Sequence, residues 1–232
     1  MTGMAHDAGA IALVDGAQSA PHMKVDMKEI GCDFFALSGH KMLAPTGIGA
    51  LYAKEELLEA MPPVYGGGDM IRSVGFQEST WNELPWKFEA GTQNIEGAIG
   101  MKAAVRYLKK LGMDEIREHE KELTSYALKR LSELDYVKVY GLGIEGIARR
   151  LGVIAFSIDG VHSHDAAAVF DSEGIAIRSG HHCAMPLVRE IINEAAVSRM
   201  SFYIYNTKQE IDLAIEAIGK ARRMFAKNAS QA

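Results

Sequence analysis

Three short apolar runs, each bounded by glycine-rich turns, constrain the fold of this chain more than any other feature. The runs cover residues 10–17, 32–39 and 47–53, and a helical pattern follows the third run. Continuous apolar runs of this length are typical of strands that are buried on both faces of a mainly parallel sheet. The sequence therefore predicts an α/β fold for its first half.

Amphipathic patterns then predict long helices over residues 96–112 and 113–134. The apolar residues expected on one face of the second helix are Leu123, Ala127, Leu131 and Leu134. Short strands are expected at residues 137–140, 152–158, 175–178 and 199–205. By contrast, residues 62–80 have no sustained period and contain three consecutive glycines, so we expect a long functional loop there.

Two further helices are predicted to begin at Ser163 and at Thr207, and the latter forms a capping-box pattern with Glu210. The change in pattern along the chain indicates two domains. We predict that residues 1–108 belong to a large domain with a mainly parallel sheet. Residues 109–232 are expected to form a small C-terminal α+β domain.

Composition excludes several classes of function. The chain has 232 residues, of which 48% are hydrophobic and 24% charged, as in soluble globular proteins. Its formal net charge of -5, without a basic cluster, argues against nucleic-acid and anionic-membrane surfaces. No apolar segment approaches the roughly 20 residues that span a bilayer, and the first residues lack a secretory-signal pattern. The two cysteines lie far apart, so we expect no disulfide framework and a cytoplasmic location.

Asp15 and Lys41 each stand where an apolar run stops. Open parallel sheets gather their ligand-binding groups at such strand ends. A lysine amine can form a Schiff base with an aldehyde, and a carboxylate can keep a pyridine nitrogen protonated. This pair of residues is what a pyridoxal phosphate enzyme requires. The alternative is that Lys41 reaches into water and Asp15 caps a turn.

Five sequence blocks strengthen the cofactor hypothesis: LVDGAQSAPH, DFFALSGHKMLAPTGIGALYAKEELLEAMPP, YGGGDMIRSV, FEAGTQN and RSGHHCAMPL. Together and in this order they resemble the SufS-type (group II) cysteine desulfurases of the class V aminotransferase superfamily. The resemblance covers nearly the whole chain. It implies a fold-type I pyridoxal-phosphate-dependent transferase that acts as a homodimer.

The resemblance also implies the site residues for pyridoxal 5'-phosphate. They are Lys41 as the cofactor-bearing lysine, Asp15 on the pyridine nitrogen, Gln18 on the ring oxygen, Ser38 and His40 on the phosphate, and Thr92 on the phosphate of the neighbouring subunit.

Cys183 follows two histidines in the last block. Nearby positive groups stabilise a thiolate, and His181, His182 and Arg178 can provide them. The alternative is a small buried apolar residue, but the resemblance implies that Cys183 forms a persulfide. Cys32 has no such surroundings and is expected in the core.

Arg199 opens an apolar strand, and the resemblance implies that its guanidinium binds the substrate carboxylate. Arg178 is expected to assist it, or else to form an ordinary surface ion pair. A metal site is a further alternative, with Cys183 and four histidines as candidate ligands: His162, His164, His181 and His182. Their spacing fits no compact zinc motif, so we predict no metal.

The resemblance implies conversion of L-cysteine, or selenocysteine, to alanine, with sulfur passed to a SUF-type acceptor protein for iron–sulfur cluster assembly. Members of the family carry a long N-terminal part before the Asp-bearing strand, including a histidine that stacks on the cofactor. No position here matches that histidine, so we expect a chain that lacks this part. Gln93 stands where relatives usually carry proline. Two alternatives stay open: a catalytically silent fragment, and a related lyase or aminotransferase.

Overall fold

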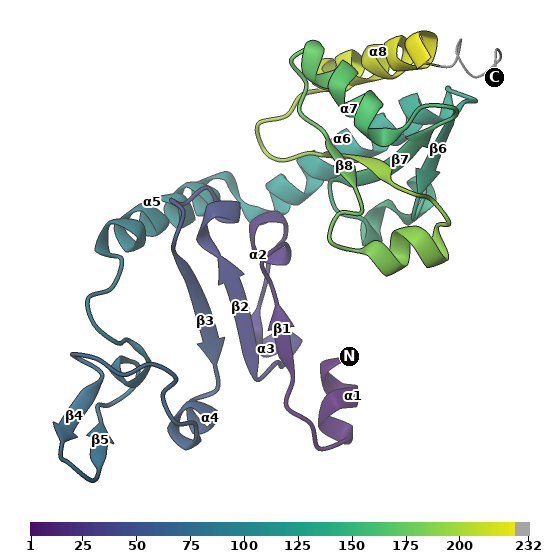
Figure 1. The fold of residues 1–232 in the computed structure, drawn as a ribbon. Coiled ribbons are helices and arrows are strands. Elements are labelled where there is room, and N and C mark those ends of the chain that lie inside the picture. The colour runs from purple at the N-terminus through teal and green to yellow at the C-terminus, as the bar shows by residue number, and fades with distance from the viewer. Residues whose placement is uncertain (226–232) are drawn as a thin grey trace. The chain divides into compact units, whose positions relative to one another are not determined.

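The computed structural model describes residues 1–225. The chain forms two compact units, unit 1 (Met1–Asp114) and unit 2 (Glu115–Ala232), each with its own sheet (Figure 1). Within the described part of the chain, no helix has both the length and the apolar character needed to cross a membrane.

Unit 1 contains eleven short elements and one long helix, α5. In chain order they are α1 (Thr2–Asp7), β1 (Leu13–Asp15), α2 (Ser19–His22), α3 (Met27–Ile30), β2 (Phe34–Ser38), the 3-10 turn η1 (Gly39–Met42), β3 (Gly49–Ala53), α4 (Glu55–Ala60), β4 (Ile71–Val74), β5 (Ser79–Trp81), η2 (Trp86–Phe88) and α5 (Ile95–Leu111).

The main sheet of unit 1 has the strand order β1–β2–β3 (Figure 1). β1 and β2 are parallel, whereas β2 and β3 are antiparallel. The α/β fold class is confirmed, but the described sheet is mixed rather than mainly parallel. The reason is the connection over residues 39–48, which is too short for the crossover helix that a parallel pair needs.

The buried carboxylate of Asp33 joins three segments at the end of the sheet where β2 begins. Asp33 accepts hydrogen bonds from the Ala12 N–H at 2.7 Å, from Lys54 Nζ at 2.6 Å and from His6 Nε2 at 2.8 Å. The backbone hydrogen bond from Ala12 first, and then those from Lys54 and His6, hold the pKa of Asp33 well below its usual range. Asp33 therefore fixes the entry to β1 and the exit from β3.

Residues 62–80 are more regular than the sequence pattern indicates, because β4 and β5 pair as an antiparallel hairpin. Ser73 Oγ and Thr80 Oγ1 form a cross-strand hydrogen bond at 2.6 Å. The expectation of an entirely irregular loop is wrong, since strands of this length are too short to give a readable period.

Unit 2 is built around a four-stranded sheet, and α6 leads into it. The elements are α6 (Met113–Ser132), β6 (Val137–Tyr140), η3 (Ile144–Arg149), β7 (Val153–Ile158), α7 (Ser163–Ser172), β8 (Arg178–Gly180), the π-helical turn η4 (Leu187–Ile191), β9 (Val197–Ser201) and α8 (Lys208–Phe225). The strand order is β6–β7–β9–β8, and all neighbouring strands are antiparallel.

The core of unit 2 joins this sheet to α6, α7 and α8. Leu123, Ala127 and Leu131 of α6 are buried in it and Leu134 packs against it, so the predicted apolar face is confirmed. Phe156 of β7 is fully buried at its centre. Burial of a side chain of this size contributes roughly 2 kcal/mol to the free energy of unfolding.

Some boundaries in unit 2 differ from the expected ones. The capping box of α8 is confirmed, because the Thr207 N–H donates to the Glu210 carboxylate at 2.8 Å and the Glu210 N–H donates to Thr207 Oγ1 at 3.3 Å. α7 begins at Ser163 as predicted, but its N-cap is His162 rather than Ser163. β8 begins later and β9 earlier than predicted, because cross-strand pairing rather than apolar content decides where they start.

Candidate active site

Two strand ends in unit 1 bring Asp15 and Lys41 to the same edge of the sheet. Asp15 is opposite Ala36 in the parallel ladder, and the Gly16 N–H donates to the Ala36 carbonyl at 2.8 Å. β2 ends at Ser38, directly before η1, which carries Lys41. This edge is the one at which parallel strands collect ligand-binding groups.

Two glycines explain how the backbone reaches these positions. A Cβ at Gly16 would lie 1.8 Å from the Phe35 ring, and a Cβ at Gly39 would lie 2.8 Å from the Ile48 carbonyl oxygen. Only glycine permits such close approaches. The backbone on which Asp15 and Lys41 are mounted is therefore tightly packed against its neighbours.

The candidate side chains at this strand-end site form few hydrogen bonds with the rest of the described chain. Lys41 is half-buried, and no side chain or carbonyl in residues 1–225 forms a hydrogen bond or ion pair with its amine. Asp15 is exposed and accepts one hydrogen bond at Oδ1, from the Ala17 N–H at 2.9 Å. Ser38 Oγ and His40 Nδ1 lie 3.0 Å apart. Gln18 is exposed at the start of α2.

Thr92 lies in the segment between η2 and α5 and is exposed. The following Asn94 caps α5 by accepting the Gly97 N–H at 2.8 Å, and its Nδ2 donates to the Gly47 carbonyl at 3.1 Å. Asn94 thus ties the Thr92 segment to the loop that follows Lys41. Asn94 is not among the site residues predicted from the sequence, although its position just before a helical pattern is typical of a cap. The role of Thr92 toward a neighbouring subunit stays a prediction.

A second group of functional side chains lies on the β8–β9 pair of unit 2. Arg178 of β8 is directly opposite Arg199 of β9. Arg178 Nη2 lies 3.4 Å from the sulfur of Cys183, which is exposed. Like charges opposite each other destabilise a sheet. An anion bound between the two guanidinium groups would remove that cost.

Several buried nitrogen atoms around this arginine pair have no hydrogen-bond partner in the described part of the chain. They are Arg199 Nε, His181 Nε2 and His182 Nδ1. Burial, and then the charge of Arg178, lower the pKa of the Arg199 guanidinium. Buried polar atoms without partners are costly, which supports a site that a polar ligand completes.

His182 does not supply the positive charge expected beside Cys183. Burial, and then the charge of Arg199, lower the pKa of His182, so its ring is neutral at neutral pH. Its Nε2 lies 3.1 Å from the Val197 carbonyl. His182 and Cys183 both have left-handed backbone angles, with φ of 55° and 61°. Arg178 is therefore the cation that contacts the thiol.

The remaining candidates fall outside these two groups. Cys32 is fully buried, as expected for a core residue. The His162 and His164 rings are 5.0 Å apart, and the His164 N–H donates to His162 Nδ1 at 3.3 Å. Residues 1–225 contain no group of three or more His, Cys, Asp or Glu side chains arranged around a metal position.

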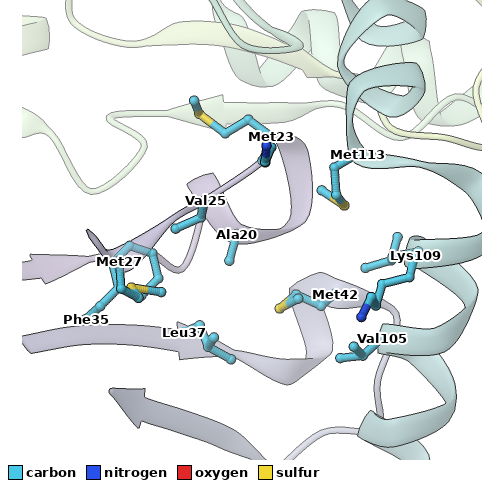
Figure 2. Close-up of a pocket in the computed structure, with 12 residues that line it drawn as sticks. Ala20, Met23, Val25, Met27, Phe35, Leu37, Met42, Val105, Lys109 and Met113 are labelled. Carbon is cyan, nitrogen blue, oxygen red and sulfur yellow. The ribbon is translucent and has the colours of Figure 1, made fainter. Parts of the chain in front are cut away.

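An apolar cavity of ≈ 250 Å³ also lies in unit 1 (Figure 2). Met23, Met42, Phe35 and Leu37 are among the side chains that line it. Met42 follows Lys41 and contributes to the wall of the cavity, so it anchors η1 in apolar surroundings. None of the predicted cofactor-binding residues lines this cavity, which therefore is not the strand-end site.

Comparison with known proteins gives the family context of these groups. The model of the family described as aminotransferase class-V matches residues 1–213. A probable cysteine desulfurase of Halalkalibacterium halodurans is 55% identical over 222 residues, which are 96% of this chain and 53% of the relative. This chain thus spans about half the length of the curated relatives it matches.

Solved structures of cysteine desulfurases match this fold as well. The crystal structure of the cysteine desulfurase CsdA from Escherichia coli, in an S-sulfonic acid form, matches with a TM-score of 0.88 and 38% identity, over 96% of this chain and 54% of that chain. The apo structure of a cysteine desulfurase from Thermococcus onnurineus matches with a TM-score of 0.88 and 39% identity, over 97% of this chain and 55% of that one. The fold is therefore that of the fold-type I enzymes.

Proposed function

The chain belongs to the aminotransferase class-V family, and from this premise we propose that it carries the catalytic residues of a pyridoxal-phosphate-dependent cysteine desulfurase. The observation that carries the proposal is the exposed thiol of Cys183 beside Arg178, which is itself opposite Arg199. A nucleophilic sulfur next to a site for a carboxylate fits an enzyme that takes sulfur from an amino acid. The SufS-type sequence blocks and the cysteine desulfurases among the relatives support the same assignment.

The residue types at the strand-end site fit the cofactor. Lys41 offers an amine that no group of residues 1–225 engages, and Asp15 offers a carboxylate whose local hydrogen bond, from the Ala17 N–H, uses Oδ1. Ser38 and His40 would hold the phosphate, and Gln18 would hold the ring oxygen. When bound there, pyridoxal phosphate supplies an electron sink for negative charge at the substrate Cα.

Each of the chain's own residues would then have a separate role. The Asp15 carboxylate would pair with the pyridine nitrogen of the cofactor, and the Lys41 amine would take the α-proton of the substrate and later return a proton. Arg199, assisted by Arg178, binds the substrate carboxylate through charge-assisted hydrogen bonds.

Cys183 would perform the sulfur transfer. Its thiolate attacks the substrate sulfur, a new S–S bond forms, and the Cβ–S bond of the substrate breaks. The electron pair of the broken bond stays on the substrate carbon, which is then protonated. L-cysteine and the Cys183 thiol thus become L-alanine and a Cys183 persulfide, and no external oxidant is consumed.

The finer assignments belong to the same proposal. The exposed sulfur suits delivery to a SUF-type acceptor that supplies iron–sulfur cluster assembly, and selenocysteine is an alternative substrate. Exposed apolar side chains next to Thr92, such as Trp86, Ile95 and Ile99, support a homodimer. Both cysteines are free thiols, which supports a cytoplasmic location.

A second candidate is a chain that holds these residues but does not turn over without further polypeptide. It is favoured by the outer strands of the unit 1 sheet, β1 and β3, each of which pairs on one side only in the described residues. Leu13 of β1 is 63% exposed and Leu51 of β3 is 58% exposed. A related lyase or aminotransferase is disfavoured, because those reactions need no thiol beside Arg178.

Turnover with a cysteine-specific control tests the proposal. The purified chain, incubated with pyridoxal phosphate and L-cysteine, should form alanine and protein-bound sulfane sulfur. Cys183→Ser should abolish both products, whereas Cys32→Ala should retain them if the protein remains folded. A folded Cys183→Ser protein that releases sulfide at the wild-type rate would sink the assignment. A wild-type chain without turnover would favour the second candidate.

A further inference from the structure

The segment over residues 181–196 carries Cys183 and joins β8 to β9. It includes the short turn η4 but no strand, so no sheet ladder holds it in place. Its position depends on a few individual contacts. One of them is the contact of His182 with the Val197 carbonyl, and another is the buried side chain of Val188, which belongs to the segment itself.

A further contact comes from β6, the edge strand at the other end of the strand order from β8. The Tyr140 hydroxyl of β6 donates to Glu194 Oε1 at 2.6 Å, and it lies 2.9 Å from Ser157 Oγ of β7. A phenol has one proton, so Tyr140 donates to the carboxylate and accepts from the serine hydroxyl. Burial, and then the hydrogen bond with Glu194, raise the pKa of Tyr140 to about 12, which keeps this donor protonated at neutral pH.

Both ends of this hydrogen bond are themselves held. The Tyr140 backbone is paired with Ala155 in the sheet, and its carbonyl accepts from Arg150 Nη2 at 3.2 Å. Lys138 Nζ lies 3.6 Å from Glu194 Oε1 and gives the carboxylate a second contact with β6. A hydrogen bond can hold the segment in one position only if its other partner is itself fixed. Tyr140 is fixed by the sheet.

Backbone hydrogen bonds continue the connection toward the thiol. The Glu194 N–H donates to the Val188 carbonyl at 3.0 Å, and the Val188 N–H donates to the Ala184 carbonyl at 3.0 Å. Ala184 is the residue after Cys183. Two consecutive main-chain bonds therefore link the anchored carboxylate to the neighbour of the reactive sulfur.

We propose that the Tyr140–Glu194 hydrogen bond is the tether that holds the Cys183 segment in its reactive position, which makes Tyr140 and Glu194 positioning residues. The inference rests on the proposed function for its kinetic consequence. Its structural part, an ordered segment over residues 181–196, does not depend on turnover.

The chain offers a matched control for the loss of a hydrogen bond from a half-buried tyrosine to a carboxylate. Tyr126 of α6 donates to Asp212 Oδ1 at 2.8 Å, in the same unit and with the same pair of groups. Tyr126→Phe thus removes a hydrogen bond of the same chemistry, but one that does not touch residues 181–196. Glu194→Gln is the conservative variant, because an amide oxygen can still accept from Tyr140.

The test has a structural arm and a kinetic arm, both on the full chain. In hydrogen–deuterium exchange, the peptide over residues 181–196 should exchange about tenfold faster in Tyr140→Phe and Glu194→Ala than in the wild type. The exchange should stay near the wild-type rate in Tyr126→Phe and Glu194→Gln. In steady-state desulfuration, the first two variants should lose about tenfold in kcat with little change in KM, because the substrate carboxylate is bound elsewhere.

Each outcome of these two experiments supports or overturns one part of the proposal. Exchange that is unchanged in Tyr140→Phe, or equally fast in Tyr126→Phe, would overturn the tether. Faster exchange with an unchanged kcat would overturn the positioning role. If the wild-type chain shows no desulfuration, the proposed function falls, while faster exchange in Tyr140→Phe and Glu194→Ala alone would still support the tether.

Discussion

Arg178 and Arg199 are directly opposite each other on neighbouring antiparallel strands, and the sulfur of Cys183 lies 3.4 Å from Arg178. Two guanidinium groups at adjacent positions of a sheet require an anion or solvent to offset their repulsion. In the proposed reaction the anions are the substrate carboxylate and the thiolate, so the same charge arrangement binds the substrate and prepares the nucleophile.

Replacement of Arg199 by lysine tests the carboxylate site. Lysine keeps the charge but loses the planar fork that can bind a carboxylate through two hydrogen bonds. We expect KM for L-cysteine to rise roughly 10- to 100-fold in Arg199→Lys, which corresponds to the loss of one charged hydrogen bond. Steady-state kinetics of alanine formation measures it. Arg130→Lys, which alters an arginine paired with Asp212, should leave KM unchanged. Equal KM values in all three proteins would remove Arg199 from the substrate site.

The carboxylate of Asp33 predicts how the stability of the chain depends on pH. Its folded-state pKa is well below the unfolded value of about 3.9. Its stabilisation is therefore fully present above about pH 4, and it is lost as the pH falls toward the folded-state pKa. Urea unfolding should show Asp33→Asn to be less stable than the wild type at pH 7, with a gap that narrows below about pH 4.

Asp7→Asn is the control for this experiment, because it removes an exposed carboxylate of α1 that lies outside the hydrogen bonds around Asp33. A gap between wild type and Asp33→Asn that stays constant from pH 7 to pH 3 would contradict the role given to the three donors around Asp33.

Gly16 should be intolerant of a side chain. A methyl group there would lie 1.8 Å from the Phe35 ring, so Gly16→Ala must displace either the ring or the Asp15 turn. Overpacking of this kind typically costs about 1–3 kcal/mol of unfolding free energy. We expect a lower melting temperature and weaker retention of pyridoxal phosphate. Gly66→Ala, at a position with open space around it, should match the wild type; if Gly16→Ala is equally stable, the packing described for this turn is incorrect.

The strand ends that carry Asp15 and Lys41 could be predicted from the sequence, because buried strands leave continuous apolar runs and these two polar residues stand where the runs stop. α5 and α6 were also predictable, since each is long enough to repeat its apolar face several times. The direction of β3 and the β4–β5 hairpin could not be predicted from the sequence. Both depend on pairing between short segments, which leaves no periodic signal.

The details of the Cys183 site were beyond sequence reasoning for a different reason. The contact between Arg178 and the sulfur depends on left-handed backbone angles at His182 and Cys183, which non-glycine residues rarely adopt. The neutral state of His182 depends on burial and on Arg199, which is distant in sequence. The Tyr140–Glu194 bond likewise joins residues far apart in the chain.

The central claim is that this chain uses Lys41 to hold pyridoxal phosphate, and the visible absorption spectrum of the purified protein with added cofactor tests it most directly. Lys102→Ala, which alters an exposed lysine of α5, serves as the matched control. We predict a visible band of lysine-bound cofactor in the wild type and in Lys102→Ala, and its loss in Lys41→Ala. A wild-type chain without this band, or a band of equal intensity in Lys41→Ala, would contradict the account.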